Sequence, residues 1–415
     1  MRRWTLLARR SRIADIPVDP NPPAPGGCAT RGATTDYARR LEQEIRTFEG
    51  VFQGRMKQDV PPIWDKVEER MADRIEQACG VRNLYAYVAR HLAGRREASV
   101  LGLGSGACGN ELDGIAPLLS AQGCRMSLTC LDVNEAVLRQ AEQEAAARGV
   151  PFRAVIQDAN TLSLETAAYD VVVAYASLHH FLDLERVAAQ VNRALRPDGT
   201  FVTVDIPTRN GYLMWPETLE VVNAIWRSLP AAYRVAHTGF AAPTLVERRD
   251  NIDYSAGSFE CINSEAILPA LDRHLVRESF VPALSLARRF FDTQFGPNYD
   301  WGRPLDRAIF EFVMALDEHS LDSGMLRPET FFGAYRKRLE RPPNDSSAPA
   351  AQPATAAPPA GPPSVEVELR DELARLRSEL DAIRSSRSFK LARRLQALRR
   401  LWDRLRALAH RSRTR

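Results

Sequence analysis

The chain has 415 residues, a hydrophobic fraction of 45% and a formal net charge of +4 at pH 7. This length allows one large domain with appendages, or two domains. No apolar run approaches the roughly 20 residues that a membrane-spanning helix needs. The basic start "MRRWTLLARRSR" lacks the long apolar region and the cleavage site of a signal peptide, so we expect a cytoplasmic protein.

The charge is unevenly distributed along the chain. Residues 387–415 carry eleven Lys or Arg and one acidic residue, Asp403, which gives a local charge of +10 and leaves −6 for the rest. A strongly basic C-terminal segment therefore follows a mildly acidic body. Such segments are typical of contact with anionic lipid or nucleic acid.

The cysteines are scattered, and no two of them stand at the spacing of a metal-binding knuckle. We therefore expect reduced, mostly buried thiols and predict no metal site. The six are Cys28, Cys79, Cys108, Cys124, Cys130 and Cys261.

The first 95 residues divide into two parts. Residues 1–35 are rich in Pro, Gly and Thr, which predicts a disordered N-terminus because this composition buries too little apolar surface to order itself. Residues 36–95 place apolar side chains three and four apart, which predicts N-terminal helices. Pro61 and Pro62 are expected to separate them.

The pattern changes from residue 96 to residue 206. Helical stretches separate five short β-rich runs: "ASVLGLG", "SLTCLDV", "FRAVIQD", "YDVVVAYA" and "GTFVTVDI". This alternation predicts an α/β fold with a Rossmann-like, doubly wound, mostly parallel sheet. We place the domain built on this sheet at residues 96–340.

Residues 207–262 do not fit the alternation and are rich in Trp, Tyr, Pro and Arg. We interpret them as a lid insertion. The domain then resumes with expected helices over residues 264–274 and 306–322.

The C-terminal part of the chain divides into three segments. Residues 341–363 are rich in Pro and Ala, a composition that predicts a disordered linker. In residues 364–385, apolar residues alternate steps of four and three, which predicts a short coiled coil that joins a second copy or another protein. A single solvated helix is the alternative, because the repeat has fewer than three heptads. Residues 386–415 predict a basic amphipathic helix with leucines and Trp402 on one face.

The glycine-rich turn "GLGSGACG" follows the first predicted strand and precedes a helical pattern. Gly102, Gly104 and Ala107 formally satisfy the dinucleotide-binding pattern, which is weak evidence by itself. S-adenosylmethionine sites use a similar turn, in which the backbone lies against the methionine part of the cofactor. Asp132 ends the second strand, where a carboxylate can accept hydrogen bonds from ribose hydroxyls, and Asp158 ends the third, where it suits an adenine amino group.

Taken together, these pieces resemble the class I S-adenosylmethionine-dependent methyltransferases, especially the small-molecule branch with Leu-His-His after the fourth strand. The resemblance covers residues 96–206 and implies S-adenosylmethionine as the cofactor. It also implies that Gly104, Gly106, Asp132 and Asp158 bind this cofactor, and Gly102, Ala159 and Tyr175 are further candidates for cofactor binding.

The glycine turn departs from the family pattern at two positions. The family's acidic residue, which normally holds the methionine amino group, is Gly102 here, and its last glycine is Cys108. Glu111, in the first turn of the next helix, is a candidate replacement for the acid. The alternative is that Glu111 only complements the helix dipole.

The end of the fourth strand narrows the choice of methyl acceptor. "AYASLHH" is neither the Asn-Pro-Pro-aromatic signature of amino-group methylation nor the Pro-Cys of cytosine C5 enzymes. His179 and His180 are the candidate catalytic residues, with His180 favoured as the base that takes the acceptor's proton. The alternative is that one packs under the cofactor and the other caps a turn. The lid would cover the acceptor, and its Trp215, Trp226 and Tyr254 are candidates to stack on a sugar or aromatic ring.

The tail carries a second resemblance. "SSRSFKLARRLQALRRL", residues 385–401, resembles a segment at the end of many bacterial surface-polysaccharide glycosyltransferases and methyltransferases, although Arg394 stands where proline is common. This resemblance implies a small-molecule or glycan acceptor, most simply a sugar hydroxyl, and a peripheral position on the inner face of the bacterial cell membrane. The basic amphipathic pattern is also that of an interfacial anchor.

Two other functions remain open. A basic arm on an acidic body can bind nucleic acid, which would make the protein an RNA methyltransferase or a tethered RNA binder. Nucleic acid is the less favoured partner, because the tail's apolar face would then be unused. A non-catalytic scaffold that recruits partners through its coiled coil is the other alternative.

Overall fold

The computed structural model describes residues 31–52, 60–237 and 241–339. These residues all belong to the first of two compact units, Met1–Arg341. The predicted linker, coiled coil and basic amphipathic helix lie outside the described residues, as does most of the expected disordered N-terminus.

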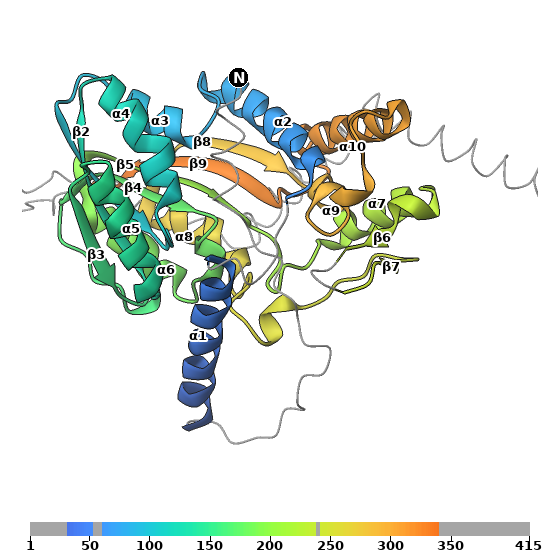
Figure 1. Cartoon of the computed structure of the whole chain (residues 1–415), viewed down its shortest axis with the longest axis horizontal. Helices are drawn as coiled ribbons and strands as arrows, with labels where there is room; N and C mark the ends of the chain where they lie inside the picture. The colour runs from blue at the N-terminus through green and yellow to red at the C-terminus, as the bar shows by residue number, and fades with distance from the viewer. Residues whose placement is uncertain (1–30, 53–59, 238–240, 340–415) are drawn as a thin grey trace, which may run out of the picture. The chain divides into compact units, whose positions relative to one another are not determined.

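A seven-stranded sheet forms the centre of the domain, in the order β3-β2-β1-β4-β5-β9-β8 (Figure 1). The first five strands are parallel, as predicted, and the last two run antiparallel to their neighbours. The Rossmann-like, mostly parallel fold is therefore confirmed, with two strands that the sequence reading did not predict. The strands are β1 (Glu97–Leu103), β2 (Arg125–Asp132), β3 (Phe152–Ile156), β4 (Tyr169–Tyr175), β5 (Leu195–Asp205), β8 (Leu275–Leu284) and β9 (Thr330–Lys337).

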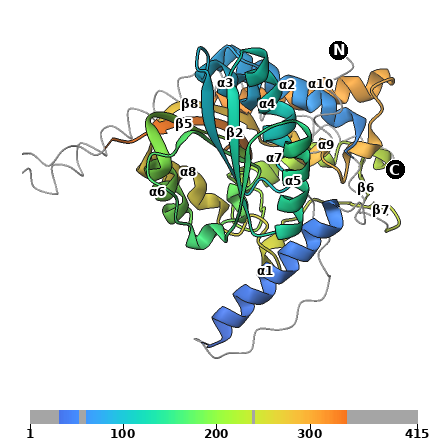
Figure 2. The ribbon, with the colours of Figure 1, turned by 60° about the vertical axis from the view of Figure 1, so that its left-hand side comes forward.

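Helices cover both faces of the sheet (Figures 1 and 2). Successive residues of a strand point to opposite faces, so Val100 joins the core beneath α3, α4 and α5, whereas Leu101 joins the core beneath α6 and α8. These helices are α3 (Leu84–His91), α4 (Ala116–Ala121), α5 (Glu135–Ala147), α6 (Leu184–Ala194) and α8 (Ile267–His274). Both faces are thus buried, which explains the near-continuous apolar runs of the central strands.

The N-terminal helices form as predicted, with one shifted boundary. α1 (Arg31–Phe52) begins within the range expected to be disordered, and α2 (Pro62–Cys79) begins at a proline. Proline suits the first turn of a helix because it lacks an N–H that would have no partner there. Residues 31–35 are therefore helical, and the prediction was wrong for them.

The insertion belongs to a third apolar cluster at the β8 end of the domain. α7 (Pro216–Trp226) packs there with α2, α9 (Arg288–Phe291) and α10 (Pro304–Asp322). The insertion also contains a small two-stranded sheet of β6 (Val235–Ala236) and β7 (Thr244–Leu245). Among the helices that the structure describes, none combines the length and apolar character needed to cross a membrane.

Candidate functional site

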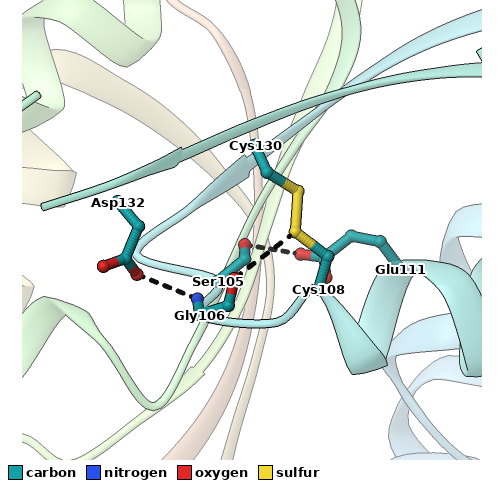
Figure 3. The surroundings of a disulfide bond; sticks show 6 residues. All are labelled: Ser105, Gly106, Cys108, Glu111, Cys130 and Asp132. Carbon is teal, nitrogen blue, oxygen red and sulfur yellow. Dashed lines mark hydrogen bonds between the residues drawn. A yellow bond between two sulfur atoms is a disulfide. The ribbon is translucent and has the colours of Figure 1, made fainter. Parts of the chain in front are cut away.

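The glycine turn lies at the carboxyl end of β1, between β2 and β4, where open α/β sheets bind their ligands (Figure 3). Gly104 has a φ of +64°, and its N–H donates to the Leu131 carbonyl at 2.8 Å. A Cβ on this residue would lie 2.9 Å from the Ser177 Cβ. Only glycine fits here, because the position combines a left-handed conformation with close contact to the loop after β4.

Asp132 ends β2 and faces the same turn. One of its carboxylate oxygens accepts from the Gly106 N–H and the other from the Asn134 N–H, both at 2.9 Å. Burial raises the pKa of Asp132 above its usual value, against the effect of these hydrogen bonds. The predicted ribose-binding carboxylate is thus held rigidly beside Gly106.

Glu111 points into the turn rather than out toward solvent (Figure 3). It is 1% exposed, and its Oε1 accepts from the Ser105 hydroxyl at 2.8 Å. A Cβ on Gly102 would lie 2.6 Å from this oxygen, so the Glu111 carboxylate fills the space that a side chain at residue 102 would enter. Its Oε2 is buried without a hydrogen-bond partner among the described residues, and burial raises the pKa of Glu111 to about 7.

Cys108 and Cys130 form a disulfide bond between the glycine turn and β2 (Figure 3). The expectation of reduced thiols is therefore wrong for these two cysteines, because strand β2 brings residues 22 apart in sequence into contact. Cys108 has a φ of +55°, the left-handed conformation that glycine adopts most easily. The position where the family has its last glycine thus keeps a glycine-like backbone.

Asp158 follows β3 and is contacted by the N-terminal helix. The Tyr37 hydroxyl on α1 donates to its Oδ2, and the Asn160 N–H donates to its Oδ1 at 2.8 Å. Burial of the Tyr37 hydroxyl and its hydrogen bond to Asp158 raise the pKa of Tyr37 to about 12. Ala159 is buried in the core beneath α6, and Tyr175 is half-buried at the end of β4.

The two candidate catalytic histidines lie side by side after β4, with ring centroids 4.2 Å apart, in different surroundings. His179 is 1% exposed, and its Nδ1 lies 2.6 Å from Asp205 Oδ1. His180 Nδ1 lies 2.7 Å from the Glu44 carboxylate on α1. Burial alone would lower the pKa of His180, but the Glu44 carboxylate outweighs it and raises the pKa to about 9.

Asp205 organises this loop from the end of the neighbouring strand β5. Its carboxylate accepts from four backbone N–H groups as well as from the His179 ring. The four donors are Ser177, Leu178, His179 and Ile206. Glu260 approaches both histidines from the insertion, 3.8 Å from His179 Nε2 and 3.7 Å from His180 Nε2.

The aromatic residues of the insertion differ in how far their side chains are buried, and so in whether they could contact a ligand. Trp226 has no exposed surface, packs against Phe290 and Phe295, and donates from Nε1 to the Val246 carbonyl. The expectation that Trp226 stacks on a ligand is therefore wrong, because this side chain is core. Trp215 and Tyr254 are half-buried.

Four functional candidates were missed by the sequence reading: Tyr37, Glu44, Asp205 and Glu260. Asp205 ends the fifth predicted strand, so the rule that placed Asp132 and Asp158 at strand ends could also have found it. The other three lie outside the alternating pattern, on α1 and in the insertion. Nothing in their local sequence distinguishes them from surface carboxylates and a core tyrosine.

Comparison with known proteins gives one family and several partial relatives. A methyltransferase domain family matches residues 101–203. A sterol 4-C-methyltransferase of Caenorhabditis elegans is 25% identical over 155 residues, 37% of this chain and 42% of that protein. Phthiotriol/phenolphthiotriol dimycocerosates methyltransferase 1 of Mycobacterium ulcerans is 30% identical over 139 residues, 33% of this chain and 48% of that protein.

A solved structure with a similar fold is that of geranyl diphosphate C-methyltransferase from Streptomyces coelicolor A3(2). Its identity is 15% and its TM-score 0.35, with 61% of this chain and 79% of that chain covered. The present chain spans less than half the length of the two relatives matched by sequence. The methyltransferase match covers β1 to β5, the part of the chain that carries the glycine turn, Asp132, Asp158 and both histidines. Residues 101–203 are therefore similar to a methyltransferase domain.

Proposed function

We propose that the chain transfers a methyl group from S-adenosylmethionine to the hydroxyl of a small-molecule or glycan acceptor. One observation carries this proposal. The ligand-binding edge of the sheet places the Asp132 carboxylate at the glycine turn, and the half-buried His180 after β4 is paired with the buried Glu44 carboxylate of α1. The same edge of the sheet thus carries groups that could bind the cofactor and groups that could accept the proton of the acceptor hydroxyl.

The residues present fit the cofactor. Gly104 and Gly106 leave the backbone bare, and the Asp132 carboxylate keeps lone pairs for two ribose hydroxyls. The buried Glu111 Oε2, which has no hydrogen-bond partner among the described residues, suits the cationic amino group of the methionine part. Glu111 would then replace the family's acid, whose position is Gly102 here. When bound, S-adenosylmethionine supplies a methyl group on a sulfonium.

The Tyr37 hydroxyl donates to the Asp158 carboxylate, the group that would accept from an adenine amino group. Because it comes from α1, we propose that α1 covers the adenine end of the site. Ala159 and Tyr175 would line the same end.

The chain's own chemical task is to orient the acceptor and to move one proton. We assign the proton to the His180–Glu44 pair, whose facing atoms are 2.7 Å apart. In the neutral form of the ring, Nδ1 keeps its proton toward the Glu44 carboxylate and the lone pair lies on Nε2. This ring can accept the hydroxyl proton as the acceptor oxygen attacks.

The identity of the acceptor rests on the tail. The resemblance of residues 385–401 to polysaccharide enzymes supports a sugar hydroxyl on a glycan at the inner membrane face. The insertion, residues 207–262, would close over this acceptor. No feature of the described residues favours RNA or a non-catalytic scaffold.

Replacing Asp132 with alanine is expected to weaken S-adenosylmethionine binding about 10- to 150-fold. The reason is that a hydrogen bond to a charged group contributes about 1.5–3 kcal/mol. Calorimetric titration of wild type and variant measures the change. Asp272→Ala, which removes an exposed carboxylate paired with Arg277, should bind as wild type does. Equal affinities for Asp132→Ala and wild type, or wild-type preference for NAD, would contradict the assignment.

The full-length protein is expected to sediment with vesicles that contain anionic lipid, and added salt should weaken this binding. Replacing Leu395, Leu398 and Trp402 with serine keeps the charge and removes the apolar face, so binding should fall at least about tenfold. RNA binding depends mainly on charge and should survive this replacement. Unchanged vesicle binding by the triple variant would refute the anchor, and a wild-type preference for RNA would favour the nucleic-acid alternative.

A further inference from the structure

Three potential metal ligands from two distant segments meet beside the proposed acceptor site. His179 follows β4, whereas Glu260 and Cys261 lie at the end of the insertion, about 80 residues later. One donor atom from each residue lies within 4.8 Å of the other two, and all three residues are buried. We propose that His179, Glu260 and Cys261 bind a zinc ion.

The His179 ring is oriented as metal-binding histidines are. Its Nδ1 contacts the buried Asp205 carboxylate at 2.6 Å, which leaves Nε2 to present a lone pair on the other side of the ring. This Nε2 is buried and has no hydrogen-bond partner in the part of the chain that the structure describes. It faces Glu260 Oε1 at 3.8 Å. A ligand that accepts the lone pair would explain an otherwise costly buried nitrogen.

Two distances between the donor atoms agree with tetrahedral zinc, and the third is at most 4.8 Å. Ligands about 2.0–2.3 Å from zinc lie about 3.3–3.8 Å from one another. Glu260 Oε1 is 3.8 Å from His179 Nε2 and 3.5 Å from Cys261 Sγ. The set of one nitrogen, one oxygen and one sulfur suits zinc and not magnesium or calcium, which prefer oxygen ligands alone.

Backbone hydrogen bonds fix the two segments to each other and to the insertion. The Ile262 N–H donates to the His179 carbonyl at 3.1 Å, and the Gly211 N–H donates to the Cys261 carbonyl at 2.8 Å. The ligands are therefore held in place before any ion binds. Three protein ligands leave the fourth zinc position for a non-protein ligand, as in catalytic zinc sites.

His180 borders the proposed zinc site, since its Nε2 is 3.7 Å from Glu260 Oε2. If the proposed methyl transfer holds, this is where an acceptor oxygen would reach the ion. Zinc binding itself does not depend on that function. It is therefore tested without cofactor or acceptor.

The test is titration of the metal-free full-length protein with Zn²⁺ against a chromophoric chelator, and with Co²⁺ as a spectroscopic probe. Wild type is expected to bind one equivalent of zinc, and its cobalt form should show a thiolate-to-cobalt charge-transfer band. Cys261→Ser should abolish this band and weaken zinc binding more than tenfold. Glu260→Gln should weaken zinc binding while retaining the band.

The matched control is Cys124→Ser, which alters another buried free cysteine, in the core beneath α3 and α4. It should bind both metals as wild type does. Circular dichroism of each variant distinguishes loss of ligand from loss of fold. Wild-type binding below a tenth of an equivalent, or equal zinc affinity in a folded Cys261→Ser variant, would overturn the proposal.

Discussion

Replacing His180 with alanine is expected to lower the turnover of methyl transfer by roughly 10²–10⁴ at saturating cofactor, the range typical of a lost general base. The affinity for S-adenosylmethionine should stay within about twofold, because the carboxylate 2.7 Å from the His180 ring is that of Glu44 on α1. Single-turnover kinetics with labelled cofactor measures the first quantity. Calorimetry measures the second.

The structure supplies a matched control for this variant. His274 also forms a histidine–carboxylate pair, with Glu185 at 2.8 Å, but on α8 away from the glycine turn. His274→Ala should therefore keep wild-type turnover. If His180→Ala loses cofactor affinity and turnover together, the histidine has a packing role beneath the cofactor and the proton belongs to another group.

The parallel part of the sheet could be predicted because it is recorded in local sequence. The central strands β1, β4 and β5 are apolar runs buried on both faces, β2 and β3 are β-rich runs with exposed positions, and a helical pattern or a turn separates each strand from the next. Residues 275–284 form β8 without such a run, since this strand contains Arg277, Glu278 and Pro282 and its first residues after Leu275 are exposed. Its pairing with β9 joins segments about 50 residues apart in the sequence, and the periodicity of apolar residues within one segment cannot predict such a pairing.

The cofactor half of the site was predictable for the same reason. Asp132 and Asp158 each follow a recognisable strand, and parallel strands bring their carboxyl ends to one edge. The partners of the histidines could not be predicted in this way. Glu44 lies more than 100 residues before the histidines in the sequence and Glu260 about 80 residues after them, and only the fold brings them together. The sequence reading also left the role of Glu111 open. Its burial against Ser105 shows that the side chain points into the turn, and its role toward the cofactor stays a prediction.

The expectation of a base near neutral pH also depended on context. An isolated imidazole has a pKa near 6.5, which made His180 attractive. The Glu44 carboxylate, which becomes a neighbour only through the packing of α1, changes this to about 9. Proton transfer is therefore assigned to the pair and not to the ring alone.

Replacing Asp205 with alanine is expected to lower the free energy of unfolding by about 3–5 kcal/mol, because each buried donor left without an acceptor costs about 1–3 kcal/mol. Its carboxylate accepts hydrogen bonds from four backbone N–H groups and from His179 Nδ1. Alanine leaves these donors buried without partners, and the loop after β4 would keep its backbone hydrogen bond from Ala176 to Val204 of β5 but lose those to the Asp205 carboxylate. Urea denaturation at pH 7 of the metal-free protein measures the change.

Two further variants test this explanation. Asp198→Ala removes an exposed carboxylate paired with Arg95, so it should change stability by no more than about 1 kcal/mol. In a double-mutant cycle, Asp205→Ala and His179→Ala should be coupled by more than about 1 kcal/mol, because the two side chains are in direct contact. A loss below about 1 kcal/mol in Asp205→Ala, or additive effects in the cycle, would show that the loop is held by its apolar contacts instead. In that case Leu178, buried in the core beneath α6, would be the residue that positions both histidines.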